Sequence, residues 1–191
     1  MRSFERLQAA LGPRAAALRF AMNAGMYDET GRPIGLHVEA GKQVRRLNRA
    51  SGGGNFGMKP NGVFAVDENG RVEIATTEDW AARPRRASWA TQSGPMLVIQ
   101  GRLHPRFQAN GPSLNIRNGV GVDSRATAWF VISDDPVSFG RFARFFRDGL
   151  GCRDALYFDG AVSSLWEPAT ARRDQRAELG PIILVFRRRL D

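Results

Sequence analysis

The chain has 191 residues, 42% of them hydrophobic and 25% charged, fractions that exclude a disordered, collagen-like or disulfide-stapled protein. This length suits a single domain over residues 1–191 that buries its own core. The formal net charge is +9, and because only Lys42 and Lys59 are lysines, nearly all the positive charge is arginine. Such an excess raises the hypothesis of an anionic partner, although biased codon usage is the plainer explanation.

The sequence pattern shows neither a membrane-spanning segment nor a signal peptide. No apolar run approaches the roughly 18 residues that a membrane helix needs, and the N-terminus lacks the unbroken apolar region of a signal peptide. Cys152 is the only cysteine, so an internal disulfide is excluded and a free thiol is expected.

The first predicted elements are a helix and a strand. Apolar residues spaced by three and four after Ser3 predict a short helix within residues 3–18, interrupted at Gly12 and Pro13. Residues 19–22 are predicted as a buried strand that leads into a turn-rich stretch.

Hairpins dominate the middle of the chain. Strand-forming residues flank turn residues within the segments 36–47 and 62–74, which predicts two hairpins, the second with an Asn-Gly turn. The segment 95–103 suggests a third hairpin or a strand followed by a tight turn. A glycine-rich loop, residues 51–57, separates the first two. Two further strands are expected at 119–123 and 126–133.

One more helix is predicted between strands near the C-terminus. Ser138 suits its N-cap, and the apolar side chains that follow fall on one face and are expected to be core: Phe139, Phe142, Phe145, Phe146 and Leu150. Residues 155–158 form an apolar strand that ends at Asp159, and residues 182–186 form the last strand. These elements predict an α+β fold of largely antiparallel or mixed sheet with two or three helices.

Four glycine-rich stretches at strand ends hold polar side chains that an ordinary turn does not need. They are residues 23–26, 57–62, 92–95 and 159–164. In the second stretch, Lys59 offers a compact ammonium that suits one phosphate oxygen. Pro60 follows it where a phosphate-binding P-loop has Ser or Thr, so ATP-type phosphate binding is not expected.

Asp159 is the carboxylate most suited to chemistry. At the end of an apolar strand and before Gly160, its side chain can be partly desolvated and aimed. An Asp in this place can equally cap the following turn with its own side chain. Ser163 and Ser164 suit either hydrogen bonding to an anion or capping of a turn.

Several other chemistries lack support in the sequence. A serine hydrolase is not expected, because there is no Gly-x-Ser-x-Gly and only His37 and His104 are available as bases. No His or Cys pair has the spacing of metal ligands, so no metal is expected. Cys152 follows a predicted helix C-terminus, where the dipole disfavours a thiolate nucleophile.

Five motifs, in order, resemble the phosphodiester glycosidase family over a core of about residues 20–186. They are residues 20–27, 59–64, 92–98, 117–121 and 155–164. The resemblance implies hydrolysis of a sugar-1-phosphodiester at the anomeric carbon, with N-acetylglucosamine as the sugar known in the family, and it implies no cofactor. Where the family pattern has further glycines after the Asp, Ala161 and Val162 stand here, which puts the substrate in doubt.

The resemblance also implies roles for the motif residues. Asp159, Lys59 and Asn23 would be catalytic, with Asp159 as base or nucleophile toward the anomeric carbon. The residues expected to bind substrate are Asn61, Gln92, Ser93, Gly94, Arg117, Gly160, Ser163 and Ser164. Lys59 and Arg117 would stabilise the charge of the departing phosphate, which lessens the need for a second carboxylate.

Native export to the periplasm or the exterior follows from the resemblance, whereas the chain as written shows no leader. The alternative function is a non-catalytic module that binds phosphorylated glycans or cell-envelope polymers. Nucleic-acid binding is not expected, because the aromatic residues lie on the helical stripe and in strands and form no stacking motif.

Overall fold

The computed structural model describes residues 2–83, 86–174 and 177–187, and these form three antiparallel sheets with four α-helices. The helices are α1 (Phe4–Leu11), α2 (Gly54–Gly57), α3 (Thr77–Ala82) and α4 (Phe139–Arg144). The α+β class is confirmed, and the helix count exceeds the expected two or three. The two helices that the sequence did not predict, α2 and α3, have only four and six residues, too short for a periodic apolar pattern.

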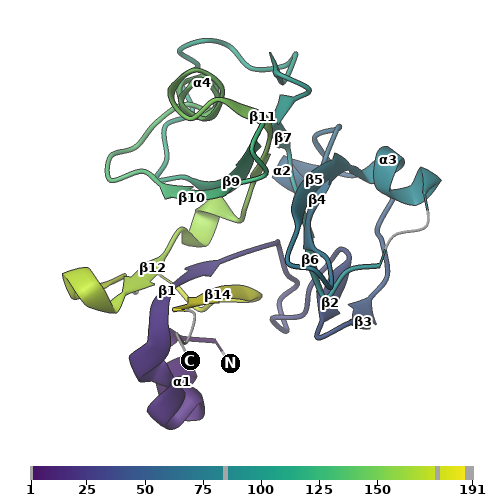
Figure 1. Cartoon of the computed structure of the whole chain (residues 1–191). Coiled ribbons are helices and arrows are strands. Elements are labelled where there is room, and N and C mark those ends of the chain that lie inside the picture. Colours follow the sequence, from purple (N-terminus) through teal and green to yellow (C-terminus); the bar gives the residue numbers. More distant parts are fainter. Residues whose placement is uncertain (1, 84–85, 175–176, 188–191) are drawn as a thin grey trace.

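The first sheet joins the two ends of the chain. Its strands are β1 (Leu18–Asn23), β12 (Leu165–Glu167), β13 (Arg172–Arg173) and β14 (Ile182–Phe186), in the order β13-β12-β1-β14. In Figure 1 this sheet lies next to α1, and β1 and β14 run side by side. The helix before β1 ends as predicted: a 3-10 helix with Pro13 in its first turn, Gly12–Ala17, follows α1.

The second sheet carries α4 on one face (Figure 1). Its strands are β7 (Met96–Ile99), β8 (Arg102–Leu103), β9 (Asn118–Asp123), β10 (Ala128–Ile132) and β11 (Cys152–Tyr157), in the order β10-β9-β11-β7-β8. The predicted N-cap of α4 is confirmed, because the Ser138 side chain accepts a hydrogen bond from the amide of Arg141 at 3.2 Å. A π-helical turn, Phe145–Gly149, continues α4 and ends before β11.

The third sheet contains two of the predicted hairpins. Its strands are β2 (His37–Glu39), β3 (Lys42–Arg45), β4 (Gly62–Val66), β5 (Val72–Thr76) and β6 (Trp89–Ser93), in the order β3-β2-β6-β4-β5. The hairpins β2-β3, β4-β5 and, in the second sheet, β7-β8 are confirmed. The central strand β6 was not predicted; it runs between β2 and β4 and carries the polar residues of the third glycine-rich stretch.

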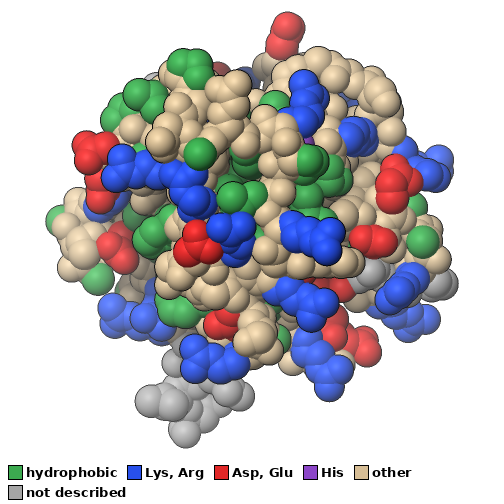
Figure 2. Space-filling model, turned by 90° about the horizontal axis from the view of Figure 1, so that it is seen from above, with side chains coloured by type: hydrophobic (Ala, Val, Ile, Leu, Met, Phe, Trp, Pro, Cys, Tyr) green, Lys and Arg blue, Asp and Glu red, His purple; other side chains and the backbone are tan. Residues whose placement is uncertain are grey.

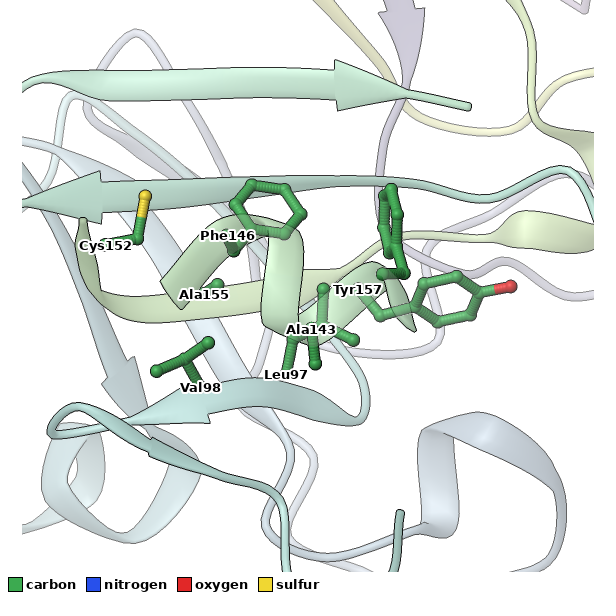
Figure 3. Close-up of a cluster of buried hydrophobic side chains, with 8 residues drawn as sticks. Leu97, Val98, Ala143, Phe146, Cys152, Ala155 and Tyr157 are labelled. Carbon is green, nitrogen blue, oxygen red and sulfur yellow. The ribbon is translucent and has the colours of Figure 1, made fainter. Parts of the chain in front are cut away.

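Of the hydrophobic clusters in the described residues, one joins the three sheets and one packs α4 on the second sheet. One, which we call the junction cluster, takes buried side chains from all three sheets: Met22, Phe64, Ile74, Met96, Val120, Leu156 and Phe158. The other lies between α4 and the second sheet (Figure 3), and there Phe142 and Phe146 are buried. Phe145 is 50% exposed and is not core, because at 100° per residue it lies off the helix face that Phe139, Phe142 and Phe146 share.

No helix within the described residues is long and apolar enough to cross a membrane. Basic side chains are spread over much of the face shown in Figure 2, with acidic side chains between several of them.

Candidate active site

The four glycine-rich stretches converge where the three sheets meet, although they are far apart in sequence. Backbone hydrogen bonds tie each to another: the amide of Asp159 donates to Ala24 (3.1 Å), that of Tyr157 to Pro95 (3.1 Å) and that of Met96 to Pro60 (2.9 Å). The peptide bonds that precede Pro60 and Pro95 are cis. The sequence-based grouping of these loops into one site is therefore matched by their placement.

Asn23, at the end of β1, holds the backbone of Asp159. Its Nδ2 donates to the Asp159 carbonyl at 2.7 Å, and its Oδ1 accepts from the Ser164 amide at 2.8 Å and from Asn118 Nδ2 at 3.0 Å. Only 1% of Asn23 is exposed. The expected contact with sugar hydroxyls is not what this geometry provides, because the amide is occupied by protein partners; Asn23 positions Asp159 instead.

Asp159 follows β11 and Phe158 and is only partly exposed. Its Oδ1 accepts a hydrogen bond from the Ala161 amide at 3.3 Å, so the capping role weighed for this residue is present. Among the described residues its Oδ2 has no hydrogen-bond partner. Burial raises the pKa of the Asp159 carboxyl above its ordinary value, and the hydrogen bond from Ala161 opposes the rise. Capping thus uses one oxygen and leaves the other for chemistry.

Lys59 is partly exposed, and its ammonium is held from one side. Lys59 Nζ donates to Asn61 Oδ1 at 3.1 Å, which leaves two N–H groups for another acceptor. Asn61 is itself 1% exposed; its Oδ1 also accepts from Thr77 Oγ1 at 2.8 Å, and its Nδ2 donates to the Phe56 carbonyl at 2.9 Å. Asn61 therefore orients Lys59, and its side chain is held by protein partners instead of pointing toward a substrate as expected.

Gln92, on β6, is also a buried structural amide. Its Oε1 accepts from the amides of Leu36 and Asn48, each at 2.9 Å. Its Nε2 donates to the Asn48 carbonyl at 2.7 Å and to Thr77 Oγ1 at 3.0 Å. With all four hydrogen-bonding positions filled, Gln92 has none left for a sugar, which corrects its expected role.

The three serines of the motifs differ from one another. Ser163 Oγ donates to the Ile116 carbonyl at 3.0 Å and Ser164 Oγ to the Val162 carbonyl at 2.8 Å, so the backbone satisfies both hydroxyls in place of an anion. Ser93 Oγ is buried and has no hydrogen-bond partner within the described residues. Gly94 beside it is required by close packing, because a Cβ there would lie 2.6 Å from the Cβ of Asn61.

Arg117 is placed beneath the loops and is not free for a phosphate. It is 1% exposed, its Nε donates to the Val137 carbonyl at 2.8 Å, and its guanidinium carbon lies 3.6 Å from the ring centre of Phe139. One Nη donates to the Ser113 carbonyl at 2.9 Å and the other to the Tyr157 hydroxyl at 3.2 Å. The expected stabilisation of the departing phosphate by Arg117 is therefore wrong for this arrangement: all three guanidinium nitrogens have protein partners.

Gly160 lies against the hydroxyl of Tyr157. A Cβ at position 160 would come within 1.6 Å of that oxygen, so only glycine fits. The ring of Tyr157 is at the edge of the cluster drawn in Figure 3, with its hydroxyl pointing away from the other side chains. Burial raises the pKa of Tyr157, and Arg117 opposes the rise. The expected role of Gly160 in binding substrate is therefore replaced by a packing role. It lets the Asp159 loop lie directly on the Tyr157 hydroxyl, which Arg117 also binds.

The site includes residues that sequence reasoning did not assign. Asn118 and Tyr157 lie inside quoted motifs, and Thr77 had no signal at all. Tyr27, at the end of the first motif, has its pKa raised by burial and by the nearby Asp159 carboxylate, and its hydroxyl donates to the Glu178 carbonyl. Their position in the motifs was the available signal for three of these four.

Within the described part of the chain, no group of three or more His, Cys, Asp or Glu side chains comes together as a set of metal ligands. The polar groups that meet at the site are amides, one carboxylate, one lysine and hydroxyls. This set can act on a substrate through one carboxylate and one cation.

Comparison with known proteins identifies the family of the chain. The family model for phosphodiester glycosidase matches residues 16–186. The chain is 38% identical over 173 residues to the uncharacterized protein YigE of Escherichia coli (strain K12), covering 90% of this chain and 66% of that protein.

The fold is similar to a solved structure from zebrafish, the catalytic domain of N-acetylglucosamine-1-phosphodiester alpha-N-acetylglucosaminidase auto-inhibited by its pro-peptide. The TM-score is 0.65 at 15% sequence identity, and the match covers 90% of this chain and 64% of that one. The chain thus spans about two thirds of the length of each of these proteins. Since the family model spans nearly the whole sequence, the chain belongs to the phosphodiester glycosidase family, whose name denotes a glycosidase-type hydrolase.

Proposed function

We propose that this protein hydrolyses a sugar-1-phosphodiester at the anomeric carbon and releases a free sugar and a phosphomonoester. The observation that carries the proposal is the partly desolvated Asp159 carboxyl, which has one oxygen capped, one oxygen unpaired among the described residues, and a backbone fixed by Asn23. A carboxylate of raised pKa is a stronger base and nucleophile than an exposed one.

Asp159 acts on the anomeric carbon, either by attacking it or by activating a water. Most glycosidases need a second carboxyl group to protonate the leaving oxygen. A phosphate ester is a weak base and departs without full protonation, so charge stabilisation replaces that proton. One carboxylate is then sufficient.

Lys59 supplies the charge stabilisation. Its ammonium has two N–H groups beyond the one that binds Asn61, and these face a phosphate oxygen in the proposed complex. Arg117 has no part in this step. Among the basic residues of the motifs, Lys59 is therefore the one that stabilises the negative charge of the departing phosphate.

The buried amides form the support of the site. Asn23 fixes the backbone of Asp159, Asn61 fixes the ammonium of Lys59, and Gln92 joins Thr77 to the loop at Asn48. Their role is to hold the carboxylate and the cation in place before substrate binds, which lowers the reorganisation that the reaction requires.

The sugar that we propose is N-acetylglucosamine, on the basis of the reaction named for the zebrafish enzyme of similar fold. Ala161 and Val162, in the loop after Asp159, stand where the sequence departs from the glycine-rich family pattern. Export to the periplasm stays a prediction from the family.

Hydrolysis in water enriched in ¹⁸O tests which bond breaks. We expect the label in the released sugar and none in the phosphomonoester. Water attacks the anomeric carbon in either route, of the substrate itself or of a glycosyl-enzyme formed with Asp159. Label in the phosphomonoester would show attack at phosphorus and would exclude the proposed chemistry. Binding of the phosphodiester without any release would favour the alternative of a non-catalytic module.

A further inference from the structure

The proposed reaction leaves one buried imidazole unused. His104, directly after β8, is 1% exposed. Its backbone amide donates to the Leu97 carbonyl at 3.2 Å, which fixes the main chain at this position. A fully buried imidazole whose two nitrogens both have partners is a defined hydrogen-bonding device.

The hydrogen bonds of His104 determine its tautomer. Nδ1 accepts from the backbone amide of Arg106 at 3.2 Å, so it carries no proton. The proton is on Nε2, which lies 3.0 Å from the carbonyl oxygen of Lys59 and donates to it. Burial lowers the pKa of His104, which keeps the ring neutral at pH 7 and this donor in place.

Lys59 is thus held at both of its ends. Its carbonyl accepts from His104, and its ammonium donates to Asn61. Since the carbonyl and the side chain leave the same residue, the imidazole sets the direction in which the lysine side chain starts.

A series of aromatic rings fixes the plane of the imidazole. We call this the ring stack: His104 lies on Phe107 with ring centres 4.7 Å apart, Phe107 lies on Phe139 at 4.9 Å, and Phe139 meets Tyr157 edge-on at 4.7 Å. Arg117 lies over Phe139 and binds the Tyr157 hydroxyl, against which Gly160 packs. The ring stack therefore begins at His104, which contacts the Lys59 loop, and ends at Tyr157, which contacts the Asp159 loop.

We infer that His104 is a positioning residue for Lys59, and that its Nε2–H, held in place by the ring stack, orients the lysine toward the phosphate group of the substrate. The effect on turnover rests on the proposed function. The effect on the placement of Lys59 does not, and it is measurable without a reaction.

The test compares His104→Gln with His104→Met. Both variants lose the ring and the Nδ1 acceptor, but only Gln carries an N–H donor at about the reach of Nε2. Because the chain has just two lysines, selective ¹⁵N and ¹³C labelling of lysine gives one probe signal from Lys59 and one control signal from the exposed Lys42. Each protein is titrated with inorganic phosphate.

We expect His104→Met to shift the Lys59 signal and to weaken its response to phosphate by about tenfold or more, with the Lys42 signal unchanged. His104→Gln should restore most of both. Where the reaction is observed, the KM for the phosphodiester should follow the same order. Identical Lys59 signals in wild type and both variants would overturn the inference.

A measurement on the unaltered protein guards against a variant that fails to fold. The ¹⁵N shifts of His104 should show a protonated Nε2 and an unprotonated Nδ1 at pH 7, and the opposite tautomer would overturn the inference. If wild type shows the predicted tautomer and the Lys59 effects but no hydrolysis, the proposed function fails while the positioning role stands.

Discussion

At the scale of single residues, the proposed site depends on one carboxylate and one cation, and the protein surrounds these two groups differently. Asp159 is partly desolvated and capped on one oxygen, whereas Lys59 keeps two donors free. The side chains around them are buried amides that are satisfied within the protein. We expect the substitution of one of those amides to lower activity indirectly, by displacing the residue that the amide holds in place.

The raised pKa of Asp159 predicts the pH dependence of the reaction. A base or nucleophile must be ionised, so kcat/KM should rise with pH through the pKa of Asp159, at a pH above the ordinary 3.8 of an aspartate. A pH–rate profile between pH 3 and 8 measures this limb. A profile that is flat across the acidic range would contradict the role of Asp159.

The same shift predicts the pH dependence of stability. In the pH range between the ordinary pKa of 3.8 and the raised folded pKa, the native state binds more protons than the unfolded state. The free energy of unfolding therefore falls as pH rises through that range, and the loss persists at neutral pH. Asp159→Asn should remove this loss and raise the free energy of unfolding at pH 7, as measured by urea denaturation at several pH values. A less stable variant at pH 7 would contradict the argument.

At the scale of elements, the hairpins were predictable and the short strands were not. The β4-β5 hairpin places two strand-forming segments on either side of an Asn-Gly turn, which is a strong local signal for this pairing. By contrast, β12 and β13 have three and two residues; β12 pairs with β1, and β13 pairs with β12. The partners of such strands are distant in sequence, which a local pattern does not record.

The sequence predicted which segments form the site but not which way their side chains point. Glycine-rich loops with polar residues identified the right segments, but the direction of each side chain depends on contacts such as that of Asn23 with Asp159, 136 positions away. Gln92 and Arg117 consequently looked like ligand-binding groups and are instead structural. His104 gave no local signal, since its partner Lys59 precedes it by 45 positions.

The π-helical turn after α4 gives a matched pair of neighbouring phenylalanines. Phe146 is fully buried and Phe145 is 50% exposed. Phe146→Ala should lower the free energy of unfolding by about 3–5 kcal/mol, because it leaves a cavity in the cluster of Figure 3. Phe145→Ala should change it by less than about 0.5 kcal/mol. Equal losses in urea denaturation would contradict the burial of Phe146 and the exposure of Phe145.

At the scale of the whole molecule, the three sheets depend on the junction cluster. Met96, Phe64 and Met22 come from different sheets and meet there, so each sheet shares part of its core with the other two in addition to the cluster of its own. The proposed active site lies at the same junction, so we expect its loops to be fixed only when all three sheets are assembled.

This dependence predicts one unfolding transition. Trp89, Trp129 and Trp166 lie in the third, second and first sheet respectively, and Trp80 lies in α3. Labelled with fluorotryptophan, these residues should lose their native ¹⁹F signals at a single urea midpoint. Met96→Ala should lower that midpoint for all of them together, at a cost of about 2–5 kcal/mol. Separate midpoints for the three sheets would contradict a shared core.

The central claim is that Asp159 performs the hydrolysis of a sugar-1-phosphodiester. The most direct measurement is the release of free N-acetylglucosamine from a nucleotide sugar by wild type, Asp159→Asn and Asp154→Asn. Asp154 is the matched control: it lies on β11, the strand that precedes Asp159, burial also raises its pKa, and its carboxylate accepts from the Gln100 amide on the β7-β8 turn.

We predict release by wild type and by Asp154→Asn, and a rate at least about 10²-fold lower for Asp159→Asn with its fold retained. Comparable rates for wild type and a folded Asp159→Asn would contradict the claim.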